Sequence, residues 1–187
     1  MLGASSGRSL TTGNKNIAVG LYALGDTDYD TSLTGDHNIG VGWKALGRLT
    51  SGEYNIAIGA EASKSVAASS NNIGIGRYSN AAGGDGNVGV GYYTLANINS
   101  SGTKNTSVGY EAGGSITSGQ NNLLLGNRSG TSNSPSGNVT TASDIVCLGD
   151  DDINSLYCAD TSISSSDKRD KTDVADFTHG LKWINQL

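Results

Sequence analysis

The sequence predicts an all-β protein: a β-solenoid or β-roll of stacked coils, assembled as a parallel homotrimer, with a short helical segment at the C-terminus. Three observations lead to this prediction. A pentapeptide recurs along the chain, large and small residues alternate inside it, and glycine-containing turn signals separate its copies. The composition agrees, because 28 of the 187 residues are Gly and only 35% are hydrophobic.

The repeated pentapeptide first appears as Asn-Ile-Ala-Val-Gly at residues 16–20 and returns six times, with a degenerate eighth copy at residues 146–149. Successive closing glycines are 15 to 23 residues apart, and most steps are close to 17. A period of this length is typical of solenoids. The closing glycines are Gly20, Gly42, Gly59, Gly76, Gly91, Gly109, Gly126 and Gly149.

Within each copy, two large aliphatic residues flank a residue that is usually small, as Ile17 and Val19 flank Ala18. Alternation with a period of two is typical of a β-strand. We expect the β-branched face to be buried, and the small-residue face to allow close approach of another backbone. This small-residue face is therefore the surface that we expect neighbouring chains to share.

Polar segments with a glycine precede most copies, and we expect these glycines to supply the positive φ angles of tight corners. They are Gly13, Gly35, Gly52, Gly102 and Gly119. After each closing glycine, a stretch such as residues 21–24 is compatible with a second short strand or edge. Each repeat is then one coil of a solenoid whose backbone groups pair from coil to coil.

The predicted core of a single chain is thin, because each coil offers about five strand residues, and the whole chain has one Phe and one Met. Burial at roughly 25 cal/mol per Å² must offset the ordering of many Gly, Ser and Asn residues. Lengthwise association of several chains solves this problem. We predict a parallel homotrimer, although period and composition do not distinguish three chains from two.

Composition also excludes several classes of protein. One Pro excludes collagen, and a net charge of −5 without a basic cluster in the repeats argues against nucleic-acid binding. No apolar run is long enough to insert into a membrane, and residues 1–10 lack the features of a signal peptide. Cys147 and Cys158 are interpreted as reduced thiols, which fits synthesis in a cytoplasm.

The predicted organisation has four parts: a lead-in at residues 1–13, the repeat rod at 14–130, a less regular β segment at 131–166 and a helical segment at 167–187. In the last part glycine becomes rare and charged residues become frequent. Its apolar residues Val174, Phe177, Leu181 and Ile184 are spaced 3, 4 and 3 apart. Such spacing defines one face of a helix.

The sequence from Ser166 to Lys171, with the Gly-Leu-x-aromatic-Ile-Asn-x-Leu pattern at residues 180–187, resembles the start of the S74 intramolecular chaperone of phage tail fibres, tailspikes and endosialidases. The resemblance implies a trimeric chaperone that cuts between Ser166 and Asp167, with Ser166 as nucleophile and Lys171 as its activator. The alternative is that Ser166 only caps a helix and that Lys171 is a solvated charge near the start of that helix. Because the sequence ends at Leu187, we expect a truncated chaperone that does not cleave itself efficiently.

The repeats resemble the head repeats of trimeric autotransporter adhesins, which form a trimeric β-roll. Together, the two resemblances imply the distal part of a trimeric phage tail fibre or spike that attaches to host-surface glycan or protein. Its location would be the virion, after synthesis in the host cytoplasm. The alternatives are a self-cleaving S74-type endopeptidase fragment and a bacterial adhesin head on the cell surface.

Aromatic residues that follow the closing glycines are the candidate binding residues, because rings in register could stack on sugars. They are Tyr22, Trp43, Tyr78, Tyr92, Tyr93 and Tyr110. The alternative, which we favour, is packing between coils or chains. The asparagine that opens each copy could form a hydrogen-bonded ladder or occupy a turn conformation.

No cofactor or metal is expected. Asp150, Asp151 and Asp152, with Asp144 and Asp160 nearby, do not have the spacing of an EF-hand loop and are interpreted as a solvated acidic loop. His37 and His179 lack partners at metal-ligand spacing. No pair of carboxylates stands out as a glycan-cleaving site, so no activity is expected from the repeats.

Overall fold

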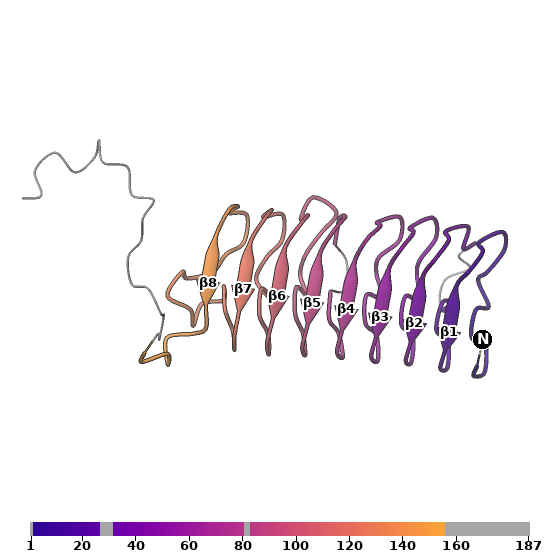
Figure 1. The fold of residues 1–187 in the computed structure, drawn as a ribbon, viewed down its shortest axis with the longest axis horizontal. Helices are drawn as coiled ribbons and strands as arrows, with labels where there is room; N and C mark the ends of the chain where they lie inside the picture. Colours follow the sequence, from indigo (N-terminus) through magenta and orange to yellow (C-terminus); the bar gives the residue numbers. More distant parts are fainter. Residues whose placement is uncertain (1, 27–31, 81–82, 156–187) are drawn as a thin grey trace, which may run out of the picture. The chain divides into compact units, whose positions relative to one another are not determined.

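The computed structural model describes residues 2–26, 32–80 and 83–155, and residues 1–154 make up one compact unit. This unit is a parallel β-solenoid with one short strand per coil (Figure 1). Each pentapeptide copy forms one strand, as predicted. The strands are β1 (Ile17–Val19), β2 (Ile39–Val41), β3 (Ile56–Ile58), β4 (Ile73–Ile75), β5 (Val88–Val90), β6 (Thr106–Val108), β7 (Leu123–Leu125) and β8 (Val146–Leu148).

The eight strands form a single sheet in chain order, and every neighbouring pair is parallel. The register is that of the sequence repeat: Ile17 pairs with Ile39, Ile39 with Ile56, and Ile56 with Ile73. β8 continues the ladder beside β7, so the degenerate eighth copy behaves as a true repeat. An isolated bridge between Leu2 and Val19 extends the pairing before β1.

The coils are simpler than predicted. Each strand has three residues rather than five, and the described stretches after the closing glycines contain turns instead of a second strand. In the first of these turns, Tyr22 and Leu24 have left-handed φ angles of 59° and 52°. A strand cannot accommodate such angles, so the chain turns a corner there and returns toward the next strand.

The predicted sidedness of the strands was wrong. The small central residues point inward and are fully buried, as Ala18 and Ala57 are, whereas the flanking Ile17, Ile58 and Ile75 are exposed. A coil whose strand faces a tight turn of the same coil has a narrow interior. At Gly40, for example, an added Cβ would lie only 3.2 Å from the carbonyl oxygen of Ala45. The large aliphatic residues therefore lie on the outer face of the sheet.

The predicted role of the turn glycines was also wrong. Gly13, Gly35, Gly52, Gly102 and Gly119 do not have positive φ angles. Four of them lie against the backbone of the next coil; an added Cβ at Gly35, for instance, would collide with the carbonyl of Gly52. The left-handed angles of this corner occur instead just before the repeated asparagine, at Lys15, His37, Tyr54, Asn71, Gly86, Lys104 and Asn121, and just before Ile145 of the last coil, at Asp144.

The repeated asparagines form a hydrogen-bonded ladder, one of the two roles that the sequence left open. Each backbone N–H from Asn38 to Asn122 in this series donates to the side-chain oxygen of the preceding asparagine, over 2.8 to 3.1 Å. The ladder ends at Ile145, whose N–H donates to Asn122 Oδ1 over 3.0 Å. These bonds satisfy buried backbone groups beside the sheet. The alternative turn role does not apply, because these asparagines lack positive φ angles.

The interior contains two apolar clusters, one under β1–β3 and one under β5–β8. Within the described ranges, no helix has the length and hydrophobicity needed to cross a membrane. The predicted helical segment at residues 167–187 lies outside the part of the chain that the structure describes.

Candidate functional site

The predicted aromatic residues lie in the two positions that follow each closing glycine, and four of them form a cluster. Tyr92 stacks on Tyr110 and on Tyr93, with ring centroids 5.2 Å and 5.8 Å apart. Tyr78 meets Tyr93 edge-on at 6.2 Å. Tyr92, Tyr93 and Tyr110 nevertheless remain exposed. The rings thus pack between coils, as the favoured interpretation held, and still present surface to solvent.

The other two predicted residues, Tyr22 and Trp43, come from earlier coils and do not join this cluster. Trp43 is exposed, and the Lys44 ammonium lies 5.5 Å from the centre of its ring. Arg77, which lies two coils further along, makes a similar contact, because its guanidinium carbon is 4.7 Å from the centre of the Tyr78 ring. Cation–π contacts of this kind stabilise the orientation of exposed aromatic side chains.

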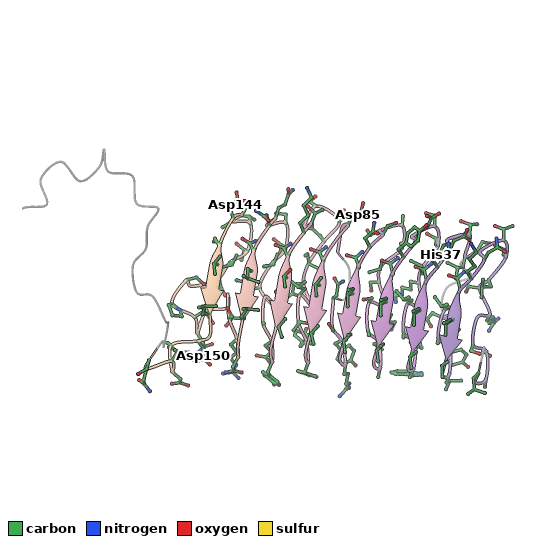
Figure 2. All side chains as sticks on the ribbon, in the orientation of Figure 1. His37, Asp85, Asp144 and Asp150 are labelled. Carbon is green, nitrogen blue, oxygen red and sulfur yellow. The ribbon has the colours of Figure 1, made fainter. Side chains whose placement is uncertain are left out.

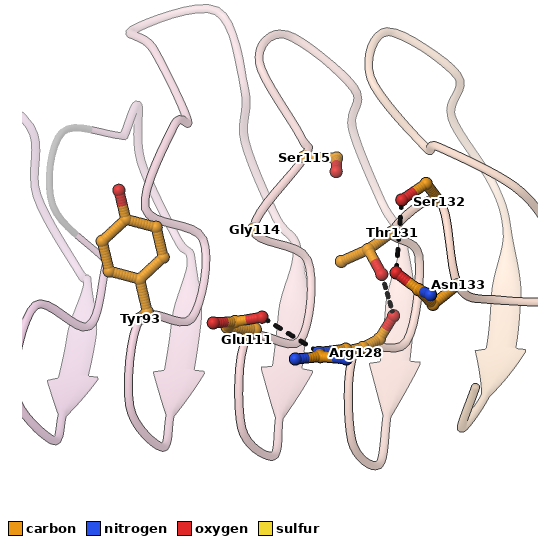
Figure 3. A pocket seen from close by; sticks show the side chains of 8 residues that line it. All are labelled: Tyr93, Glu111, Gly114, Ser115, Arg128, Thr131, Ser132 and Asn133. Carbon is orange, nitrogen blue, oxygen red and sulfur yellow. Dashed lines mark hydrogen bonds and ion pairs between the residues drawn. The ribbon is translucent and has the colours of Figure 1, made fainter. Parts of the chain in front are cut away.

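Beside the tyrosine cluster lies an open hollow of about 420 Å³. Figure 3 shows that Tyr93, Glu111 and Arg128 come from three successive coils and line one side of it. The complete lining is Tyr93, Glu111, Gly114, Ser115, Arg128, Thr131, Ser132 and Asn133. The hollow therefore combines one aromatic ring, one carboxylate, one guanidinium and several hydroxyl and amide groups.

An ion pair spans the hollow. Arg128 Nε donates to Glu111 Oε2 over 3.2 Å, and both side chains are partly exposed. A hydrogen bond to Glu111, together with the charge of this carboxylate, raises the pKa of Tyr110 above its ordinary value. Thr131 Oγ1 donates to the Arg128 carbonyl over 2.7 Å, which anchors the loop above the pair (Figure 3).

A second, smaller hollow of about 160 Å³ is lined by Arg48, Glu61, Lys64, Ser65 and Tyr78. Lys64 donates to Glu61 over 2.7 Å. Burial opposes ionisation of Glu61, but the hydrogen bond and charge of Lys64 outweigh it and lower the pKa of this carboxyl. Below the hollow, the fully buried Asp26 carboxylate lies 2.8 Å from Lys44 Nζ.

The acidic residues near the end of the rod do not form one cluster, because Asp144 lies apart from Asp150, Asp151 and Asp152. Asp150, Asp151 and Asp152 lie close together, but Asp151 and Asp152 are exposed, and Asn127 donates to the Asp150 carboxylate. Figure 2 places Asp150 at one edge of the rod and Asp144 at the other. Asp144 accepts a hydrogen bond from Asn121 over 2.7 Å. Asp160 lies outside the described residues.

Cys147 is buried at the centre of β8, with Ser134 Oγ 2.8 Å from its sulfur. Burial opposes the thiolate, but hydrogen bonds from Ser129, Ser134 and Ser136 outweigh it and lower the pKa of Cys147 to about 7. His37 stacks on Tyr54 at 4.9 Å. The proposed autocleavage residues Ser166 and Lys171 lie outside the described residues, as do Cys158 and His179.

Sequence reasoning found Tyr93 but missed Glu111, Arg128 and the residues at 131–133. A signal for the first two was present: when the repeats are aligned on their closing glycines, Tyr93, Glu111 and Arg128 occupy the same position, two residues later. The residues at 131–133 enter the hollow because the step from Gly126 to Gly149 is longer than the others, which gives this coil a larger loop.

The fold defines the described region as a parallel β-solenoid repeat protein. Comparisons with protein-family models, with curated proteins and with solved structures find no match. A functional proposal therefore rests on the geometry of the solenoid and on the sequence resemblances.

Proposed function

We propose that this chain is part of the rod of a trimeric phage tail fibre or spike, which attaches the virion to a host-cell surface. The observation that carries the proposal is the outer face of the sheet. It has sixteen outward positions, the first and third residues of eight strands, and fifteen of them are aliphatic, with Thr106 as the exception.

This aliphatic face is large for a single chain. Seven strand-to-strand steps of roughly 4.8 Å give a strip about 34 Å long and two side chains wide. Monomeric proteins rarely expose a continuous apolar patch of more than a few hundred Å², and this strip reaches that size. Burial against other copies would remove it from water and supply the apolar volume that a thin coil lacks.

The number of copies and their parallel direction come from the resemblance to trimeric adhesin heads and tail-fibre repeats. Three straight strips can meet around a common axis along the whole length of the rod. The exposed tyrosines and the hollows lie in the turns that follow the strands rather than on the strands themselves, and they would remain at the surface of the fibre. That division of labour suits an attachment fibre, because one face assembles the rod and another remains available to the host.

The test is the mass of the full chain in solution, measured by size exclusion with light scattering. We expect three times the chain mass of 19.0 kDa. The double substitution Ile58→Asp and Ile75→Asp places two carboxylates on the outer face and should yield a monomer that keeps its β circular dichroism.

The matched control is Leu21→Asp. Leu21 is 43% exposed and Ile58 is 42% exposed, but Leu21 lies in a turn rather than on the sheet. The control should keep the trimer. A wild-type monomer would contradict the proposal, and so would a trimer that both sets of substitutions leave intact.

A further inference from the structure

From the geometry of the larger hollow we infer a binding site for a neutral pyranose sugar, with Tyr93 as the stacking surface and Glu111 and Arg128 as the polar partners. The inference rests on the proposed attachment function and gives it a site and a ligand class. Among the six aromatic candidates it selects Tyr93, whose ring lines the larger of the two hollows described above.

The size of the hollow is the first argument. Small-molecule sites in proteins typically measure about 300 to 1,000 Å³. The hollow beside Tyr93 has about 420 Å³, whereas the one beside Tyr78 has about 160 Å³. Both contain a tyrosine, a glutamate and at least one cation, so their chemistry is similar. Size therefore separates them and makes the smaller hollow an internal control.

The second argument is the chemistry of the lining. A pyranose has an apolar C–H face and hydroxyl groups at its rim, so it needs an aromatic surface next to donors and acceptors. The Tyr93 ring is 39% exposed and can offer such a surface. The Glu111 carboxylate accepts hydrogen bonds, and the Arg128 guanidinium has N–H donors besides the Nε that it directs to Glu111.

The third argument is preorganisation. Tyr93, Glu111 and Arg128 have left-handed φ angles of 58°, 55° and 48°. Their backbone N–H groups each donate to the preceding coil, over 3.1, 2.8 and 2.8 Å. The three Cα atoms are thus fixed by the ladder itself. Binding groups on a rigid scaffold lose little conformational freedom when a ligand arrives.

Charge decides which sugars fit. The Glu111 and Arg128 charges cancel across the hollow, and its other lining residues are uncharged at neutral pH. The whole chain has a net charge of −5. A sialic or uronic acid would therefore meet no net positive charge there, so the site should prefer neutral hexoses and N-acetylhexosamines.

The experiment uses the full chain and a panel of immobilised oligosaccharides built from glucose, galactose, mannose and their N-acetylated amines. The same backbones capped with sialic or uronic acid form the second half of the panel. We expect at least one neutral oligosaccharide to bind. Tyr93→Ala and Arg128→Ala should each weaken that binding about tenfold or more, in line with the loss of one stacked ring or one charged hydrogen bond.

Matched variants keep the test specific. Tyr93→Phe retains the ring and should retain binding. Tyr22→Ala changes a tyrosine at the same repeat position in another coil. Lys64→Ala removes one of the two cationic side chains that line the smaller hollow. Both should bind like the wild-type chain.

The inference is overturned if no neutral oligosaccharide binds, if acidic ones bind preferentially, or if Tyr93→Ala and Arg128→Ala bind as well as the wild type. Its failure is distinguishable from failure of the proposed function. A trimer without sugar binding would refute the site and leave the fibre rod, whereas a monomer that binds sugar would do the reverse.

Discussion

The two ends of the rod fill their interiors from opposite sides of the coil. Near the N-terminus, the strand centres are Ala or Gly and the bulk comes from the turn, from Leu24 and Leu46, which lie four residues after a closing glycine. Under β7 the arrangement is reversed. Leu124 occupies the strand centre, and Gly113 and Gly130 occupy the corresponding turn positions.

The exchange is sterically necessary. A Cβ added at Gly113 would lie 3.2 Å from Leu124 Cδ1, and one at Gly130 would lie 2.7 Å from the same atom. Between the ends lie three coils with a different solution, since Ser63, Ser79, Asn80 and Thr94 are buried where the N-terminal coils have Ala or Leu. The repeat thus keeps its interior filled, although the position and polarity of the side chains that fill it differ between coils.

Removal of the distal bulk should have the largest effect. Leu124→Ala leaves a cavity that Gly113 and Gly130 have no side chains to fill. We expect a loss of about 3 to 5 kcal/mol in the free energy of unfolding, measured by urea denaturation at a fixed protein concentration. Leu21→Ala is the control, because Leu21 is exposed in a turn and does not lie on the outer face of the sheet. Equal losses from both would contradict the reversed arrangement.

The ladder that both ends share is the next target. Asn72→Ala removes the acceptor for the buried N–H of Asn87, which lies 2.9 Å from Asn72 Oδ1. A buried N–H without a partner should destabilise the rod by about 2 kcal/mol. The neighbouring Asn71 is exposed, but Asn71→Ala is not a neutral control. Asn71 has a left-handed φ of 60°, which alanine adopts less readily. Asn138→Ala, in the loop after β7, serves instead. A ladder of no energetic importance would make the two variants equally stable.

Because of Cys147, the free energy of unfolding should depend on pH. Its folded pKa of about 7 is below the ordinary thiol pKa of 9.0. The unfolded thiol therefore binds more protons between these values, so stability rises with pH across this window and is lost as pH falls toward 7. In a Cys158→Ser background, the stability advantage of Cys147 over Cys147→Ala should grow by about 1 to 2 kcal/mol between pH 7 and pH 9. A constant difference would contradict the role of the three serines.

A substitution in the polar middle of the rod should have the smallest effect on the free energy of unfolding, and it should stabilise the rod rather than destabilise it. Both polar atoms of the buried Asn80 amide lack a hydrogen-bond partner among the described residues. Leu24, Leu46 and Leu95 occupy the same repeat position with similar left-handed φ angles. Asn80→Leu should therefore stabilise the rod by about 1 kcal/mol, measured as a higher urea midpoint. A lower midpoint would indicate that this coil requires its polar interior.

The sequence was sufficient to predict the repeat period, the strand in each copy and the coil-to-coil pairing, and it offered the asparagine ladder as one of two alternatives. Each of these depends on a local pattern that recurs in register. The direction of the strand faces was not predictable in the same way, because alternation in a three-residue strand does not say which side is inside. Only the tight return of the chain, which narrows the interior, assigns Ala18 to the inside and Ile17 to the outside.

The corners and the hollow were harder to predict for a different reason. Lys15, Tyr54 and Lys104 do not belong to the residue types that favour left-handed φ angles most strongly, so their conformation is imposed by the stacked coils. Glu111 and Arg128 are ordinary surface residues in the sequence. They become a site only when the ladder stacks adjacent coils and aligns equivalent repeat positions.

The register of the sheet makes the length of the rod adjustable in whole units. Removing residues 55–71 would join Tyr54 to Asn72, preserving the sequence order of a corner residue followed by a ladder asparagine. Such a deletion would shorten the rod by one strand spacing, roughly 4.8 Å, and duplication of the same segment would lengthen it equally. The solenoid thus works as a molecular ruler, in which reach is set by the number of gene-encoded repeats rather than by the redesign of any interface.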